Sequence, residues 1–133
     1  MMKPTNKRSI EVPGVNHGQT PIPMGARKGP LIWSSGIAGK DPATGRLPED
    51  AESQARFAFQ HLRTLVERGG GTVEDIVRVT VFLKDGSLRP VVNAPWIEMF
   101  PDPEDRPARH ALIADLPGAM LVQLEVVAVV EDA

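Results

Sequence analysis

The residues best suited to chemistry are an arginine and a glutamate near the end of the chain. Arg109 closes the segment Arg106-Pro107-Ala108-Arg109, and Glu125 follows it by sixteen residues. Glu125 stands in the run 121–130, where Gln123 is the only other polar residue. A carboxylate in such an apolar run is costly to bury unless it is paired or hydrogen-bonded. Arginine keeps its charge and offers a planar fork that fits a carboxylate. The two residues therefore indicate a small polar site on neighbouring strands.

Arg109 and Glu125 could also have purely structural roles. Considered without any other information, these residue types slightly favour a structural role over a functional site. An ion pair between Arg109 and Glu125 that only stabilises the fold would use the same residue types. A charge within a strand also protects a sheet edge against pairing with another chain.

The composition is that of an ordinary globular chain and excludes several kinds of site. Of 133 residues, 41% are hydrophobic and 24% are charged, and the net charge is −2. This balance gives no overall basic surface for nucleic acid, although a local patch could be concealed within it. The absence of cysteine excludes disulfides, thiolate catalysis and Cys-ligated metals. The histidines His17, His61 and His110 lack metal-ligand spacing, so no metal site is expected.

The chain shows no membrane span and no secretory signal. No apolar run reaches the roughly 18 residues that a spanning helix needs. The basic N-terminus is not followed by an apolar stretch. We therefore expect a cytoplasmic protein with one domain, residues 1–133, in which about 1–7 form a loosely ordered end.

A helix that ends at Gly69-Gly70-Gly71 is the clearest predicted element. Asp50 suits its N-cap, and Glu52 favours the positive N-terminal end. Its apolar positions fall on one stripe, which consists of Ala55, Ala58, Phe59, Leu62 and Val66. His61 is expected on the exposed side of this helix.

Strands are predicted before and after this helix. Residues 9–12 and 31–33 precede it, and residues 75–84 follow it. Val77, Val79, Val81 and Leu83 should share one face of strand 75–84, and Ile76, Arg78, Thr80 and Phe82 the other. Both faces carry bulk, so both are expected to be covered. The last two strands are predicted over residues 108–114 and 120–130.

A second helix is expected over residues 88–100, with Pro90 in its first turn and Pro95 as an interior kink. The resulting order is β-β-α-β-α-β-β. It predicts an α+β fold with two helices packed on one face of a β-sheet. The other face would remain apolar, which favours burial against further subunits. Trp33 and Trp96 are expected in the core or in such an interface.

Short motifs over most of the chain occur in the order typical of one known family. They are Trp33-Ser34-Ser35-Gly36, Asp41-Pro42-Ala43-Thr44-Gly45, Gln54-Ala55-Arg56, residues 75–85, Val92-Asn93, Pro107-Ala108-Arg109 and residues 124–128. The chain thereby resembles the RidA/YjgF family, also labelled endoribonuclease L-PSP. The resemblance implies a chorismate-mutase-like fold of the bacillus type and a homotrimer with ligand clefts between subunits. It also implies hydrolysis of reactive 2-imino acids, or their enamine tautomers, to 2-keto acids and ammonia.

The resemblance also assigns roles within the cleft. Arg109 matches the arginine that holds the substrate carboxylate, a task that suits a bidentate fork. Glu125 matches the acidic residue that positions the attacking water. Ser35 and Asn93 match polar residues that line the cleft. An imine carbon is already electrophilic, so positioning and a polarised water suffice, and neither a metal nor an organic cofactor is implied.

The chain departs from the family pattern at the cleft itself. Ile22 replaces a tyrosine thirteen residues before the serine, and Ala111 replaces a cysteine two residues after the arginine. The main-chain N–H of Ala111 can still serve, but loss of the tyrosine removes a donor and an aromatic wall. His17 could supply the missing polar wall, although an exposed loop histidine is the favoured reading. His110 should point away from Arg109 and serve in packing.

Three functions are compatible with this sequence. The first is a hydrolytic deaminase of small imino acids, and the second is a non-catalytic binder of 2-keto acids or related metabolites. The third, a ribonuclease, ranks last because the chain lacks a basic stripe with aromatic residues and a histidine pair for acid–base cleavage. Retention of both Arg109 and Glu125 favours catalysis. The expected partner is a small carboxylate-bearing metabolite, with no nucleic acid and no membrane.

Overall fold

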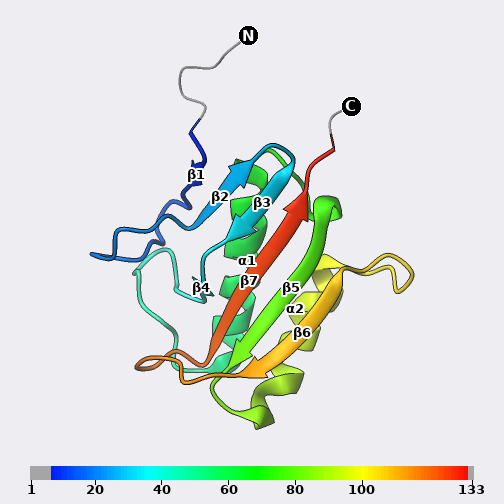
Figure 1. The fold of residues 1–133 in the computed structure, drawn as a ribbon. Coiled ribbons are helices and arrows are strands. Elements are labelled where there is room, and N and C mark those ends of the chain that lie inside the picture. Colours follow the sequence, from blue (N-terminus) through cyan, green and yellow to red (C-terminus); the bar gives the residue numbers. More distant parts are fainter. Residues whose placement is uncertain (1–6, 132–133) are drawn as a thin grey trace.

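Two helices cover one face of a mixed β-sheet, as the α+β prediction required. The computed structural model describes residues 7–131 (Figure 1). The loosely ordered end predicted for residues 1–7 therefore lies outside the described residues, apart from Lys7. The strands are β1 (Ser9–Ile10), β2 (Gly25–Lys28), β3 (Leu31–Ser34), β4 (Ile37–Ala38), β5 (Ile76–Leu83), β6 (Ala108–Ile113) and β7 (Val122–Val129). The helices are α1 (Ala51–Arg68) and α2 (Asn93–Met99), with 3₁₀ turns at Val73–Asp75 and Gly86–Val92.

The sheet has the strand order β1-β2-β3-β7-β5-β6, and β4 also pairs with β7. Pairing is antiparallel except between β5 and β6, where the intervening helical segment returns the chain to the same direction. The last strand along the chain thus lies in the middle of the sheet, while β6 lies at an edge. The short strands β2 and β4 were not predicted from the sequence.

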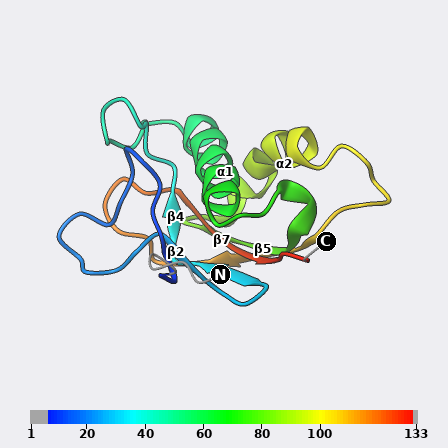
Figure 2. The same cartoon turned by 90° about the horizontal axis from the view of Figure 1, so that it is seen from above.

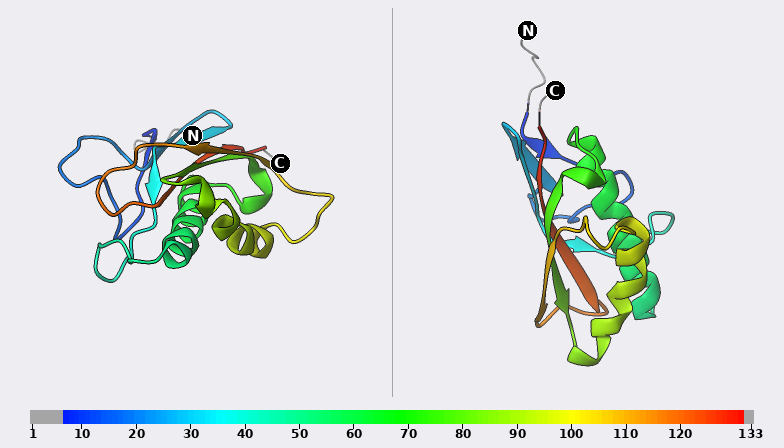
Figure 3. Two further views of the ribbon diagram at one scale, coloured as in Figure 1. Left: turned by 90° about the horizontal axis from the view of Figure 1, so that it is seen from below. Right: turned by 90° about the vertical axis from the view of Figure 1, so that its right-hand side faces the viewer.

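The two faces of the sheet differ because only one is covered by helices (Figures 2 and 3). Along β7, Val122, Leu124, Val126 and Ala128 are buried, whereas Gln123, Glu125 and Val127 are only partly buried. We call the uncovered side the open face; it carries Leu31, Trp33, Arg78, Thr80, Phe82, His110, Leu112, Gln123, Glu125, Val127 and Val129. Trp33 is 55% exposed there. Of the two places expected for it, the core is therefore excluded for a single chain, and a subunit interface stays a prediction.

The first helix follows its sequence signals closely. The side chain of Asp50 accepts a hydrogen bond from the main-chain N–H of Ser53, and Gly69 caps the other end. The predicted apolar stripe is buried, but His61 is buried too, so its predicted exposure is wrong. Nε2 of His61 donates to the carbonyl oxygen of Lys40 at 2.6 Å. The buried stripe is wider than the sequence indicated because the segment after β4 also packs against the helix.

A bulge in β5 changes which of its first residues face the helices, relative to the prediction. Ile76 pairs with Ala128 and Arg78 with Val127, so two steps along β5 match one step along β7. As a result Ile76 lies on the buried side, while Val77 is 50% exposed. The prediction that Val77 shares a face with the buried valines is therefore wrong.

The predicted second helix is divided into two parts. A 3₁₀ segment contains Pro90, and α2 begins only at Asn93. Pro95 falls in the first turn of α2, where no intrahelical N–H bond is required, so it does not kink a longer helix.

A buried glutamine joins α1 to the segment that leads into β7. Gln54 is fully buried and donates to the carbonyl oxygens of Pro48 at 2.7 Å and Ala119 at 3.0 Å. Its side-chain oxygen accepts from the N–H of Leu121 at 2.8 Å. These three hydrogen bonds fix the position at which the chain enters β7, the strand that carries Glu125.

We expect Gln54→Leu to lower the free energy of unfolding by roughly 2–4 kcal/mol, because it removes all three hydrogen bonds that the buried Gln54 amide makes to partly buried main-chain groups. Gln60→Leu is the matched control on the exposed side of α1 and should change stability by less than about 0.5 kcal/mol. Urea unfolding of both variants measures the difference. Equal stability of the two variants would contradict the anchoring role of Gln54.

Candidate active site

Arg109 lies on β6 and is held from two sides by α2. Its Nη2 donates to Oδ1 of Asn93 at 2.9 Å. Its guanidinium carbon lies 5.0 Å from the centre of the Trp96 ring, within the range of a cation–π contact. Phe100 packs edge-on against Trp96 with ring centres 4.8 Å apart. The helix therefore presents an arginine of fixed orientation at the edge of the sheet.

The charge of Arg109 has no acidic partner among residues 7–131. The ion pairs found there are Arg56 with Glu98 and Arg63 with Glu67. Partial burial beside α2 lowers the pKa of Arg109 from its usual value, but arginine stays protonated throughout the physiological range. Arg109 thus offers a positioned cation with free donors, as a carboxylate site requires.

Asn93 and Ala111 lie close to Arg109, as expected. Asn93 is the first residue of α2 and bonds Arg109 directly. Ala111 follows Arg109 by two positions on the same side of β6 and is partly buried.

Ser35 belongs to a second group, where β3 leaves the sheet. Its Oγ donates to the carbonyl oxygen of Pro23 at 2.8 Å, and its N–H donates to Met24 at 2.9 Å. His17 approaches the next residue, with Nε2 3.0 Å from the carbonyl oxygen of Gly36. His17 is partly buried, so the favoured reading as an exposed loop histidine is wrong. Ile22 is 46% exposed on the same loop.

Glu125 occupies the middle of β7 on the open face. It is paired in register with Thr80 of β5, and its side chain is half-buried. No hydrogen bond or ion pair to the Glu125 side chain is present within residues 7–131. A half-buried carboxylate without a partner has its acceptor capacity available for water or a ligand.

Arg109 and Glu125 do not form a pair within one chain. The strand β5 lies between β6 and β7, so the predicted placement on neighbouring strands is wrong. Arg109 is in register with buried Val79, whereas Glu125 is in register with Thr80. Successive residues of a strand face opposite sides, so the two charges lie on opposite faces of the sheet. The structural ion pair between them is thereby excluded for a single chain.

The sequence did not predict two residues that lie near Arg109 and Glu125. Trp96 was expected only to pack, but its ring also supports Arg109. Arg78 lies on the open face, one register step from Glu125, and donates to Oγ1 of Thr80 at 3.3 Å. Its Nη2 also lies 3.3 Å from Nδ1 of His110, which faces away from Arg109 as predicted. Arg78 shares this face with Thr80 and Phe82, as the alternation of β5 predicted, but the pairing of β5 with β7 that brings it near Glu125 was not predicted.

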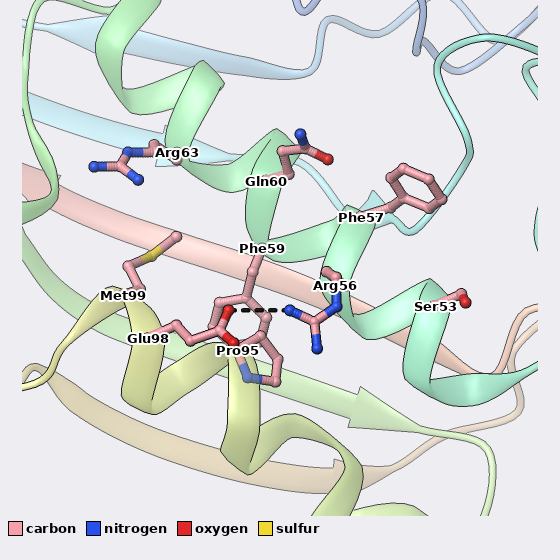
Figure 4. Close-up of a pocket in the computed structure, with 9 residues that line it drawn as sticks. All are labelled: Ser53, Arg56, Phe57, Phe59, Gln60, Arg63, Pro95, Glu98 and Met99. Carbon is pink, nitrogen blue, oxygen red and sulfur yellow. Dashed lines mark hydrogen bonds and ion pairs between the residues drawn. The ribbon is translucent and has the colours of Figure 1, made fainter.

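A separate hollow between the two helices contains none of the predicted site residues. It measures about 340 Å³ and is lined by apolar groups such as Phe57, Phe59 and Met99 (Figure 4). Arg56 and Glu98 form an ion pair at 3.0 Å across it. Arg63 also lines the hollow and pairs with Glu67 at 3.4 Å.

Within residues 7–131, no cluster of three His, Asp or Glu side chains could hold a metal ion. In the same part of the chain, no helix is both long and apolar enough to span a membrane.

Comparison with known proteins identifies the family. A family model described as Endoribonuclease L-PSP matches residues 23–130. A protein named 2-iminobutanoate/2-iminopropanoate deaminase from Salmonella typhimurium is 35% identical over 111 residues, which cover 82% of this chain and 87% of that protein. The structure of the YjgF gene product from E. coli is 31% identical, with a TM-score of 0.81 over 92% of this chain and 98% of the other. E. coli TdcF with bound serine gives 27% identity and a TM-score of 0.83 over 94% and 100%. The chain belongs to the RidA/YjgF family, and the expected chorismate-mutase-like fold is confirmed.

The contact between Asn93 and Arg109 can be tested by adding a charge. Asn93→Asp should place a carboxylate beside the guanidinium and weaken the binding of pyruvate roughly 10- to 100-fold, because the cation is then already neutralised. Asn93→Ala removes one hydrogen bond that orients Arg109 and should lower the affinity for pyruvate by about 3- to 10-fold. Isothermal titration calorimetry measures both. Unchanged affinity in Asn93→Asp would show that pyruvate binds elsewhere.

Proposed function

We propose that the protein hydrolyses small reactive 2-imino acids, or their enamine tautomers, to 2-keto acids and ammonia. The observation that carries the proposal is the Arg109 guanidinium, held by Asn93 at 2.9 Å and by Trp96, with no acidic partner in residues 7–131. A fixed cation of this kind suits the carboxylate that every 2-imino acid carries. The deaminase name of the Salmonella relative supports the same reaction.

The chemistry requires only positioning and one proton carrier. Arg109 binds the carboxylate, and Glu125 accepts a proton from a water as its oxygen attacks the carbon of the protonated imine. The resulting carbinolamine takes the proton back at nitrogen as the carbon–nitrogen bond breaks. The departing ammonia takes the hydroxyl proton, which yields the keto acid and an ammonium ion. No metal or organic cofactor enters these steps.

The positions of Arg109 and Glu125 support a site shared between subunits. They lie on opposite faces and two strands apart, which alone separates their backbones by about 10 Å. A small imino acid cannot contact both side chains within one chain. A homotrimer with three clefts would bring Arg109 of one copy beside Ser35 and Glu125 of the next. Trp33, exposed on the open face, suits such an interface.

Arg109→Ala should reduce kcat/KM by about 30-fold to several thousand-fold, because a truncated charged contact costs roughly 2–5 kcal/mol. Arg109→Lys should recover little, since a point charge does not reproduce the fork. The measurement is ammonia release from imino acids that an amino-acid oxidase generates in the assay. If Arg109→Ala matches the parent, the carboxylate-binding role is wrong.

The shared site predicts complementation between two inactive variants. Glu125→Gln should fold normally and lose most turnover, because the amide cannot accept the proton of water. When Glu125→Gln and Arg109→Ala chains are unfolded together and refolded at equal concentration, about a quarter of the sites in a cyclic trimer regain both residues. Activity should recover to roughly that fraction of the parent.

A site contained within one chain would give no recovery in this mixture. Each variant refolded alone is the control for reactivation, and light scattering measures the mass of the assembly. If 2-keto acids bind through Arg109 but no imine is hydrolysed faster than in buffer, the protein is instead a binder of these metabolites.

A further inference from the structure

Cationic side chains gather beside β1 and β2, at the edge of the sheet opposite to β6 (Figure 1). Two adjoining hollows of about 490 and 510 Å³ lie there and share most of their wall residues. The walls contain five cationic residues, which are Lys7, Arg8, Arg27, Lys28 and Arg68. Glu11 is the one acidic residue among those that line the two hollows. We call this place the basic hollow.

The concentration of positive charge in the basic hollow is opposite in sign to the charge of the whole chain. The hollow is lined by five of the 15 Lys and Arg residues but by only one of the 17 Asp and Glu residues. The fold assembles these residues from three separate segments, 7–11, 27–29 and 68–69. Clustered like charges repel one another and oppose the compact state. The cluster therefore requires an explanation beyond composition.

Two of the five cations have a structural role at the end of α1. Arg27 donates from Nη1 to the carbonyl oxygen of Gly69 at 2.8 Å and from Nε to that of Gly29 at 2.9 Å. Arg68 donates from Nε to the carbonyl oxygen of Glu11 at 2.6 Å. The bond to Gly69 offsets the negative end of the helix dipole, which would otherwise repel an anion. Both guanidinium groups are thus held in place and keep further N–H donors unused.

The other three cations have no structural role of this kind. The side chains of Lys7, Arg8 and Lys28 are exposed, and they make no hydrogen bond or ion pair within residues 7–131. The main chain brings them together, because β1 pairs with β2 and the N–H of Arg27 donates to the carbonyl oxygen of Arg8 at 2.8 Å. Their mutual repulsion is not relieved by any acidic partner in this part of the chain. An anion with several charges would relieve it.

The chemistry of the basic hollow fits an oligophosphate. Guanidinium groups bind phosphate oxygens through two parallel hydrogen bonds, and ammonium groups add point charges. Several cations around one hollow match several linked phosphate groups better than they match a single carboxylate. The volume of about 490 Å³ lies within the usual range of small-molecule sites. None of the described wall residues is aromatic, so the base stacking by which proteins hold single-stranded nucleic acids is not provided.

We infer that the basic hollow binds a small oligophosphate, either as an inorganic anion or as the phosphate chain of a nucleotide. Arg27 and Arg68 supply guanidinium groups of fixed orientation, and the side chains of Lys7, Arg8 and Lys28 add charge at the rim. Within one chain the hollow is separate from Arg109, because β3, β7 and β5 lie between β2 and β6. The inference therefore does not depend on the proposed deaminase reaction.

Isothermal titration calorimetry of the full chain compares inorganic tripolyphosphate, ATP and orthophosphate at about 0.15 M salt without divalent cations. Tripolyphosphate should bind at least roughly tenfold more tightly than orthophosphate, because one further charged contact is worth about that much. Similar binding of ATP assigns recognition to the phosphate chain of a nucleotide as well, and binding of tripolyphosphate alone assigns it to the inorganic anion. If tripolyphosphate binds no better than orthophosphate, or if only ATP binds, the inference is overturned.

Charge reversal at two rim positions tests which residues bind the anion. Arg8→Glu combined with Lys28→Glu should weaken the binding of tripolyphosphate at least about 30-fold. Arg8→Gln combined with Lys28→Gln removes the two charges without reversing them and should weaken it about 3- to 10-fold. Arg46→Glu combined with Arg89→Glu is the matched control, because it changes the net charge equally at exposed positions outside the hollow. The control should change the affinity by less than about threefold.

The remaining outcomes decide between a built site and a less specific surface. Equal losses in the reversed pair and in the control pair would mean general attraction to a cationic protein and would overturn the site. A single-stranded RNA of about ten nucleotides is titrated in parallel. If it binds through Arg8 and Lys28 more tightly than tripolyphosphate does, the surface serves nucleic acid and the inference fails. Melting temperatures without ligand verify folding, and they should not fall in the Gln pair, because repelling charges are removed.

Discussion

The alternation of side chains along β7 is the constraint on which the rest of this structure depends. Its even-numbered residues are buried under α1, so its odd-numbered residues must face the other way. The core therefore fixes Glu125 on the open face although no bond within residues 7–131 holds its carboxylate. The same register, passed through β5 to β6, fixes Arg109 on the helix side. The strand register that buries the core residues therefore also sets the separation between Arg109 and Glu125.

Local signals in the sequence predicted the local structure well. The Asp50 cap, the apolar stripe of α1 and the glycines at its end are short-range features, and each is confirmed. The division of the second helix near Pro90 and Pro95 was not predicted, because a 3₁₀ segment followed by a short helix has the same apolar spacing as one longer helix. His61 was misplaced because its partner, the Lys40 carbonyl, lies 21 residues away.

The candidate site residues could be named from the sequence, but their relation could not. Asn93 and Arg109, which the resemblance assigned to the same cleft, form a hydrogen bond between α2 and β6. Whether Glu125 faces Arg109 depends on strand order and on register, and one extra residue at the bulge near Val77 changes which side chains lie together. Neither is encoded in any short motif. The contact of His17 with Gly36 likewise joins residues 19 positions apart, which only the folded chain brings together.

The position of Arg109 on an edge strand links recognition to the exposed backbone of the sheet. Among the strands of residues 7–131, β6 pairs only with β5, so the other side of β6 presents main-chain donors and acceptors that pairing has not used. An exposed edge of this kind is a template on which an extended segment of another chain can pair. A neighbouring subunit that seals the edge would at once protect the chain from aggregation and enclose the arginine. Solubility and ligand capture would then be maintained by the same contact, so selection for one would preserve the other.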